Sequence, residues 1–426
     1  MMHRPQSAAA GLSHGPLTGL RALELADEIG QFCGKLMADL GADVIKIEPP
    51  GGQHTRAVGP FLDDIPQRER SLSFWHYNTS KRGVTLNLET PEGRGLFRRL
   101  VPTADILLET YPPGYLPALG LGYDELTRLN PGLIMCSLTP FGQTGPWRNY
   151  RTSDLLQLAA GGQMGCCGYD PEDVPEAPPI APGGGNAWHI GSHFAYMAIM
   201  AAVCYRDVTA EGQYIDASVH EACALTTEAA VPTYIYTGQV VQRHTGRAAA
   251  VEKTEPTQYV TREGAWLNTT RSGFNLTPAR LRRLAEWMDK YGLAQDLLDE
   301  KYQSTAAIQA NVSHIAGVLQ TFFASIPLEE AWHGGQELGL PWGAIRSMDE
   351  VCADQHLQDR GFFIEVEHPD LGRSFIYPGP AAIYSQSPWR ISRRAPLIGE
   401  HNAEIFCSEL GLSKAELAVL AESGVI

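Results

Sequence analysis

The chain lacks the two features that would place it in a membrane or on a nucleic acid. No apolar run approaches the roughly 18 residues that a membrane-spanning helix needs. Acidic residues outnumber basic ones, 48 to 33, and the formal net charge is −15 at pH 7. A nucleic-acid partner requires a basic face, so we expect no nucleic acid and no membrane as partner. An anionic cofactor is not excluded, because a few cationic and backbone N–H groups can bind phosphate on an acidic protein.

Cysteines at the C-x-x-C spacing are also missing. The eight cysteines are scattered and form no C-x-x-C motif, which argues against a zinc site or a redox motif. Most lie in apolar runs as small buried hydrophobes, although Cys166 and Cys167 lie in a glycine-rich stretch and could face a pocket. Residues 1–17 lack the apolar core of a signal peptide, so we expect a loose tail there. Reduced thiols fit the cytoplasm, which is the location we expect.

The glycine-rich fingerprints of nucleotide cofactors are absent too. After the first expected strand the sequence reads DEIGQ at residues 27–31, with one glycine and no G-x-G-x-x-G. No Walker A sequence is present. Neither NAD nor FAD is therefore expected as a cofactor.

The first 150 residues alternate short β-like runs with helical patterns. We expect strands at 20–26, 43–48, 83–88, 105–110 and 133–138, and helices at 29–40 and 90–100. Gly41 stands where a helix C-cap glycine belongs, and Thr90-Pro91-Glu92 is typical of a helix start. Strands that alternate with helices predict an α/β fold with a mainly parallel sheet.

Later segments follow a different pattern. An apolar helix is expected at 192–205 and a strand at 213–218, whereas residues 221–340 combine short strands with amphipathic helices. The last part returns to short β-like runs and ends in a helix at 414–422. We expect a large domain that begins at 1–220, a small domain at 221–340, and a C-terminal part at 341–426.

Several motifs together are similar to those of the class III CoA-transferase family, the CaiB/BaiF group. The family includes formyl-CoA and carnitine CoA-transferases and the α-methylacyl-CoA racemases. The resemblance covers nearly the whole chain in order and weakens only in the small domain. The matching segments are TGLRALEL (18–25), LGADVIKIEPPG (40–51), NTSKRG (78–83), SLTPFG (137–142) and RAPLIGEHN (394–402).

The resemblance implies a Rossmann-like large domain made from both ends of the chain, with a small domain inserted. Two chains would interlock as a dimer, and the substrates would be an acyl-CoA and a carboxylic acid, with no metal. It also implies that coenzyme A contacts the large domain. Carried over position by position, the contacts would include Glu28, Ile29, Gly30, Gln31, Arg56, Asn78, Lys81, Thr110, Tyr111 and Leu116.

Each of these residues also has a plain structural interpretation. The backbone at Gly30 could bind phosphate at a helix N-terminus, or it could form a simple tight turn. Lys81 and Arg82 could clamp phosphates or be solvated charges before a strand, and the same alternatives hold for Arg56. Tyr111, just past a strand, could stack on adenine or belong to the core.

The family's nucleophile is the residue in doubt. Transferases of the family use an Asp carboxylate that attacks the thioester and ends as an enzyme–CoA thioester. Counted back from Thr209, that position falls on Trp188, within GNAWHIG (185–191). No Asp or Glu occurs between Glu176 and Asp207, so a small slip in the count cannot restore the nucleophile.

A racemase is not expected either. The racemase branch has a His before the Asp of an Arg-x-x-Asp segment, and here that segment reads Arg151-Thr152-Ser153-Asp154. Ser153 takes the place of the His. Proton exchange at an α-carbon needs two positioned bases, and both are missing.

The remaining chemical candidates near position 188 are Asp154, Asn186, His189 and His193. His189 and His193 are four apart and would share a helix face, but a metal would need a third ligand. His189 could act as an acid or base or be structural. Asp154 could equally be the N-cap of a helix, since Leu155 and Leu156 follow it.

Three functions remain open. The chain could be a CoA-transferase subunit whose unlike, Asp-bearing partner supplies the nucleophile. It could act alone on an acyl-CoA as a lyase, hydratase or isomerase, through His189 or Asp154. It could also bind acyl-CoA without chemistry. Trp188 in an acyl pocket would suit an aromatic or bulky acyl group.

Overall fold

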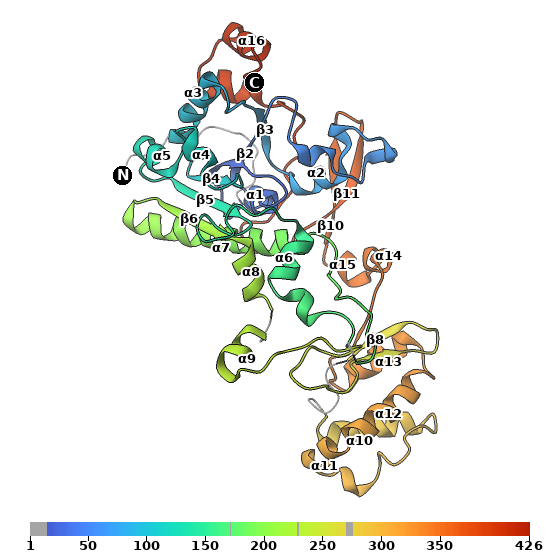
Figure 1. Ribbon diagram of the computed structural model, residues 1–426. Coiled ribbons are helices and arrows are strands. Elements are labelled where there is room, and N and C mark those ends of the chain that lie inside the picture. The colour runs from blue at the N-terminus through green and yellow to red at the C-terminus, as the bar shows by residue number, and fades with distance from the viewer. Residues whose placement is uncertain (1–14, 171, 228–229, 270–275) are drawn as a thin grey trace. The chain divides into compact units, whose positions relative to one another are not determined.

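A computed structural model describes residues 15–170, 172–227, 230–269 and 276–426 (Figure 1). The chain divides into two compact units. Unit 1 contains the chain up to Gly161 together with Gly183–Thr226 and Gln355–Ile426, and unit 2 contains Gly162–Pro182 and Thr227–Asp354. Most of the expected N-terminal tail lies outside the described residues.

A six-stranded parallel sheet is the centre of unit 1. The strands lie in the order β3-β2-β1-β4-β5-β6, which is the order of the classical doubly wound α/β fold. The predicted central parallel sheet is confirmed. The strands are β1 (Arg21–Leu25), β2 (Asp43–Glu48), β3 (Arg82–Thr85), β4 (Ile106–Glu109), β5 (Ile134–Thr139) and β6 (Gln213–Ser218).

Helices cover both faces of this sheet. Alternate residues of the inner strands, such as Leu23 and Ile45, enter a core with residues of α3, α4 and α5, while α1 and α7 pack together on the other face (Figure 1). The helices of unit 1 are α1 (Gln31–Asp39), α2 (Leu72–Tyr77), α3 (Pro91–Leu100), α4 (Tyr115–Ala118), α5 (Tyr123–Leu129), α6 (Asp154–Ala160), α7 (Asn186–Thr209), α8 (Val219–Leu225), α15 (Gln355–Asp359) and α16 (Lys414–Glu422).

Local sequence signals explain where two of these helices begin and end. The Thr90 hydroxyl accepts the Gly93 N–H at 3.0 Å and caps α3, as its T-P-E start predicts. After α1, Gly41 adopts a φ of +98°, a conformation that favours glycine, and so ends the helix. Both signals were readable in the sequence because they depend on neighbouring residues alone.

The C-terminal segment completes unit 1. The Gly83 carbonyl accepts the His401 N–H at 2.9 Å, and the Gly83 N–H donates to Nδ1 of His401 at 3.1 Å. Ile405 and Phe406 then enter the core beneath β1 and β2. An antiparallel hairpin of β10 (Phe363–His368) and β11 (Arg373–Pro378) packs with Phe74 and Trp75 of α2 in a smaller core.

Unit 2 has a separate core. A three-stranded antiparallel sheet, β7 (Gln258–Val260), β8 (Trp266–Asn268) and β9 (Gly343–Ala344), contributes Tyr259 and Leu267 to it. Leu281 and Leu284 of α10 and Phe322 of α12 pack with them. The helices are α9 (Ala230–Thr237), α10 (Pro278–Asp289), α11 (Thr305–Ala310), α12 (Val312–Phe323), α13 (Leu328–Glu337) and α14 (Met348–Cys352).

Several boundaries differ from the expectation. Among the amphipathic helices of the small domain, the apolar pattern after residue 304 is interrupted at Asn311, where α11 ends and α12 begins. The helix expected at 192–205 begins six residues earlier, at Asn186. Residues 162–182 and 341–354 group with unit 2, and the division into 1–220, 221–340 and 341–426 stays a prediction. Among the described helices, none is long and apolar enough to cross a membrane.

Candidate functional site

The loop between β1 and α1 lies at the carboxyl edge of the sheet, beside the loop that follows β4. The sheet order reverses between β1 and β4, and open α/β sheets bind ligands at such a switch point. The Thr110 hydroxyl donates to Oδ1 of Asp27 at 2.9 Å and joins the two loops. The predicted coenzyme A contacts from Glu28 to Gln31 and from Thr110 to Leu116 therefore flank one sheet edge.

The backbone at Gly30 forms a tight turn. The N–H groups of Gly30 and Gln31 both donate to the Asp27 carbonyl, at 3.1 and 2.8 Å. A Cβ at Gly30 would lie 2.8 Å from the Thr110 side chain, so the close approach of the two loops requires glycine. The turn is thus present, and phosphate binding by this backbone stays a prediction.

Arg56 is a buried ion-pair partner. It is 1% exposed, and its guanidinium binds both carboxylate oxygens of Glu48, at 2.8 and 2.7 Å, and Glu69 at 2.7 Å. Its guanidinium also lies 3.8 Å from the Phe74 ring centroid. Burial alone would raise the pKa of Glu48, but the hydrogen bonds and charge of Arg56 hold that pKa below its usual value. The solvated-charge interpretation of Arg56 is wrong.

Lys81 and Arg82 are buried as well, so the solvated-charge interpretation is also wrong for them. Arg82 donates two hydrogen bonds to Asp43, at 2.8 and 2.6 Å, and one each to Glu404 and Glu409. Lys81 donates to Oδ1 of Asn78 at 2.9 Å. Since internal carboxylates already neutralise much of this charge, a direct phosphate contact by either side chain stays a prediction.

The segment after β4 combines core residues with a perturbed carboxyl group. Leu116 is buried in the core, and Tyr111 packs against that core with its ring 4.5 Å from the Tyr115 ring. Burial is the main cause that raises the pKa of Glu109 to about 7, and of Tyr111 to about 12. The core interpretation of Tyr111 fits this packing, and adenine stacking stays a prediction.

Trp188 is the third residue of α7. Gly185, at a φ of +71°, precedes the helix and offers no side-chain cap. Instead, Oδ1 of Asp154 accepts the Ala187 N–H at 2.7 Å. The sequence interpretation of Asp154 as the N-cap of its own helix is wrong, because the Ser153 hydroxyl caps α6 by accepting from Leu156. Asp154 caps the neighbouring helix, and contacts between separate segments are not visible in a sequence pattern.

His189 lies in a cluster of rings beside Trp188. Its Nε2 is 2.7 Å from the Tyr77 hydroxyl, and its ring centroid is 4.6 Å from that of Phe32. Burial, with the charge of His193 as a smaller cause, lowers the pKa of His189. Burial likewise raises the pKa of Tyr77 and lowers that of His76 to about 4. A neutral imidazole therefore meets a neutral phenol near pH 7.

The other two candidates on α7 make local contacts. Asn186 donates from its side chain to the Gly183 carbonyl, and Nδ1 of His193 contacts the His189 carbonyl at 2.8 Å. His189 and His193 do share the helix, but no third metal-ligating side chain accompanies them in the described part of the chain. Within the same residues, the grouping that could hold an ion is Asp27, Glu28 and His54.

His189 and Tyr77 can exchange a proton across their 2.7 Å contact, whereas the Trp188 side chain has no oxygen on which an acyl or CoA ester could form. The Asp154 carboxylate lies at the start of α7, where its Oδ1 accepts the Ala187 N–H. Tyr77 and Phe32 were missed by the sequence analysis. Their signal was weak, since they lie more than a hundred residues from His189 and form no motif with it.

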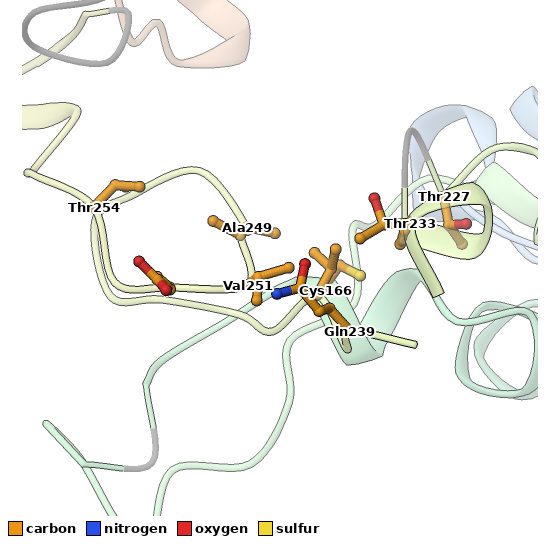
Figure 2. A pocket seen from close by; sticks show the side chains of 11 residues that line it. Cys166, Thr227, Thr233, Gln239, Ala249, Val251 and Thr254 are labelled. Carbon is orange, nitrogen blue, oxygen red and sulfur yellow. The ribbon is translucent and has the colours of Figure 1, made fainter. Parts of the chain in front are cut away.

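A cavity of about 520 Å³ lies within unit 2. Figure 2 shows Cys166 and Gln239 at its wall, with Thr227 and Thr233 on one side and Thr254 on the other. Cys166 thus lines a pocket, one of the two alternatives for the cysteine pair. The lining has no buried charged side chain, so it resembles no phosphate site.

Comparison with known proteins adds to this geometry. The family model for CoA-transferase family III matches residues 17–402. A relative from Chloroflexus aurantiacus, the succinyl-CoA–D-citramalate CoA-transferase, is 33% identical over 96% of this chain and 98% of its own. Subunit BbsE of the succinyl-CoA:(R)-benzylsuccinate CoA-transferase of Thauera aromatica is 31% identical over 95% and 97%.

A solved structure agrees in fold. The crystal structure of a CaiB/BaiF family protein from Brucella suis superposes with a TM-score of 0.76 and 26% identity. The match covers 95% of this chain and all of that chain. Both units described above therefore fall within the matched length.

Proposed function

The chain belongs to the class III CoA-transferase family, and from that premise we propose that it is the subunit of a heteromeric enzyme that lacks the nucleophile. The family membership rests on a match over residues 17–402 and on full-length relatives. The chain is accordingly a CoA-transferase, with coenzyme A thioesters as substrates. The assembly with an unlike, Asp-bearing subunit is our proposal.

Trp188 carries the proposal. An indole has no nucleophilic oxygen, and the reaction needs a carboxylate at this place. The first turn of α7 suits a carboxylate, because helix N-termini stabilise negative charge, yet this chain places Trp188, His189 and Asn186 there. We assign Asp154 a capping role, since its Oδ1 accepts the Ala187 N–H at the start of α7.

The partner would supply an Asp at the matching position. Its carboxylate attacks the thioester carbonyl, the carbon–sulfur bond breaks, and the CoA thiolate leaves with a mixed anhydride formed. The thiolate then attacks the aspartyl carbonyl and releases the first carboxylate, which leaves CoA as an aspartyl thioester. The acceptor carboxylate repeats the two steps in reverse. No metal, oxidant or further cofactor is needed.

The same proposal assigns coenzyme A to the carboxyl edge of β1 and β4. Glu28, Gly30 and Thr110 lie at the switch point of the sheet, where open α/β folds bind ligands. The N-terminus of α1 adds a favourable end of a helix dipole. His189 and Tyr77 would then act as proton donor and acceptor near the acyl group.

Succinyl-CoA is the proposed donor. The two relatives above both carry succinyl-CoA in their names, and one of them is named as a subunit. We also propose that unit 1 is a Rossmann-like domain and that two chains interlock, in keeping with the strand order and with the contribution of both chain ends to unit 1. A cytoplasmic location belongs to the same proposal.

Reconstitution tests the heteromer. The purified chain is incubated with succinyl-CoA and labelled succinate, alone and mixed with a class III paralogue of the same genome that has Asp at the matching position. Label exchange is expected only in the mixture. As a control, the paralogue carries Asn in place of that Asp.

Three results would decide against the proposal. Exchange by the chain alone would mean that it holds a nucleophile of its own. Tight binding of succinyl-CoA with no exchange in any mixture would instead favour a subunit that binds acyl-CoA without chemistry. Exchange in the mixture that survives the Asn control would show that the partner's carboxylate is not the nucleophile.

A further inference from the structure

Two buried lysines contact the two ends of the loop between β1 and α1. Nζ of Lys46 donates to the Ala26 carbonyl at 2.9 Å, and Nζ of Lys81 donates to the Gln31 carbonyl at 2.9 Å. The four residues between these carbonyls, 27–30, form the tight turn described above. Each end of the turn is thus held by an ammonium group.

One carboxylate joins the two lysines. Oε1 of Glu24 lies 3.0 Å from Nζ of Lys46, and Oε2 lies 2.7 Å from Nζ of Lys81, the second contact being an ion pair without aligned hydrogen-bond geometry. All three side chains are 0% exposed. We name Glu24, Lys46 and Lys81 the loop triad.

The chain makes room for the loop triad. A Cβ at Gly34 of α1 would overlap Oε2 of Glu24, so only glycine allows the carboxylate to lie under the helix. Ser80, immediately before Lys81, adopts a φ of +63°, and its hydroxyl donates to Asp39 at 2.6 Å. Non-glycine residues rarely adopt such a φ unless their surroundings hold them there.

The charges of the loop triad do not cancel. Two ammonium groups face one carboxylate. By contrast, Lys35, a buried lysine of α1, forms an ion pair with Asp39 at 2.7 Å. Burying a charge is costly unless a charge of opposite sign is close. The excess positive charge behind the loop therefore favours a negative charge nearby. An anion on the other side of the loop would supply the balance.

We infer that the loop triad positions the 27–30 turn and gives it the positive potential that holds the anionic part of coenzyme A. Lys46 and Lys81 are positioning residues, since they act through the loop and touch no substrate. This inference rests on the proposed coenzyme A site at this sheet edge. It goes further by naming a buried charge behind the loop as the source of affinity.

Two carboxylates, Asp27 and Glu28, lie on the turn itself, so the positive charge of the loop triad offsets part of theirs where the anion would bind. The Asp27 carboxylate accepts from the Ile29 N–H and the Thr110 hydroxyl and lies within 4.8 Å of the Glu28 and His54 side chains. Glu28 lies 2.6 Å from Nε2 of His54, which carries a positive charge only when it is protonated. Burial keeps the pKa of the neighbouring Cys33 thiol well above its usual value, so that this group stays neutral.

A pH profile follows from the same cluster. Burial, opposed by Glu24 and reinforced by Lys46 and Lys35, lowers the pKa of Lys81 to about 8. Because a lowered lysine pKa means that the charge is lost as pH rises, the affinity for an anion should fall between pH 7 and 9. The thioester of succinyl-CoA leaves no thiol of the ligand to titrate in this range.

Binding of succinyl-CoA to the purified full-length chain tests the inference by calorimetry. Lys81→Met should weaken binding roughly tenfold and flatten the pH profile, since one charge at this range is worth about a factor of ten. Glu24→Gln should move the loss of affinity to lower pH, because the Glu24 carboxylate opposes the lowering of the Lys81 pKa. Lys35→Met is the matched control, which removes a buried lysine of α1 without touching the loop carbonyls.

The outcomes separate the possible failures. If Glu24→Gln weakened binding by the same factor at every pH, the triad would be purely structural and the inference would be overturned. The wild-type pH profile needs no variant, so the inference also fails if that profile is flat from pH 7 to 9. No binding of succinyl-CoA by the wild type would instead remove the proposed coenzyme A site itself.

Discussion

At the scale of single residues, position 188 decides what the chain can do. Trp188 is half-buried at the third position of α7, in a first turn whose Ala187 and His189 N–H groups donate to Asp154 and to the Gly185 carbonyl, and the positive end of the helix dipole lies there. A carboxylate there would be stabilised by the helix terminus. The surroundings of position 188 are therefore compatible with the carboxylate nucleophile that we propose a partner subunit supplies.

Trp188→Asp tests this compatibility. After incubation with succinyl-CoA, peptides of the variant should contain CoA bound at residue 188, because the new carboxylate can attack the thioester. Mass spectrometry detects the adduct. Trp188→Asn, similar in size and without a nucleophilic oxygen, should give none. An adduct elsewhere, or the same adduct in the wild type, would contradict the assignment of this position.

Glu109 gives stability a pH dependence of its own. Burial raises its pKa to about 7 from a usual value of 4.5. Between these two pKa values the folded chain holds a proton that the unfolded chain releases. The contribution of Glu109 to the free energy of unfolding is therefore fully present below pH 4.5 and is lost as pH rises through 7. The loss attributable to this residue is at most about 3 kcal/mol.

Glu109→Gln should remove that contribution. Denaturant unfolding at pH 5 and pH 8 should show a smaller difference between the two pH values for the variant than for the wild type. The change arises because the amide does not ionise while still meeting Ser137 and the Tyr111 N–H. An unchanged difference would mean that Glu109 is ionised in the folded protein at both pH values.

At the scale of elements, α6 and α7 are linked by one hydrogen bond. Asp154 is the first residue of α6, but its side chain accepts the Ala187 N–H of α7, while the Ser153 side chain caps α6. Asp154→Ala should therefore cost about 1 kcal/mol of unfolding free energy, the usual value of a lost N-cap. Asp154→Asn keeps an acceptor oxygen and should cost less. Thermal unfolding compares the two, and equal losses would exclude a capping role.

What could be predicted from the sequence depended on how local each signal was. The strands β2 and β6 were predicted with the bounds observed. The β-branched run of β2 ends before Pro49 and Pro50, and β6 begins directly after the turn that contains Gly212. The caps at Thr90 and Gly41 were also readable. The start of α7 was not, since its cap comes from Asp154, more than thirty residues away.

The candidate site shows the same limit. Sequence motifs identified Gly30, Lys81 and the position of Trp188, but their partners come from other strands and helices. Lys81 was interpreted as a surface charge or a phosphate clamp, and its burial beside Glu24 depends on the pairing of β1 with β2 and on Gly34 of α1. Tyr77, which meets His189, belongs to no motif at all.

At the scale of the whole molecule, the main core of unit 1 and the core of unit 2 have no residue in common. The core of unit 1 combines Leu107 and Leu23 with Phe406 from the far end of the chain. The core of unit 2 combines Leu284 and Met288 with Phe322. Because packing energy is local to the contacts that are lost, damage to one core should register first in its own unit.

Leu284→Ala tests this independence. The side chain is fully buried in α10, so its truncation should cost about 2–5 kcal/mol. Hydrogen exchange should rise in α10, α12 and α13 while β1, β4 and β5 stay protected, since local opening follows the weakened contacts. Leu107 is equally buried in unit 1, so Leu107→Ala should raise exchange in β1, β4 and β5 while α10, α12 and α13 stay protected. Equal loss of protection in both units after either change would show that the two cores unfold together. In that case succinyl-CoA bound at unit 1 would protect the α10 amides from exchange as strongly as the β1 amides.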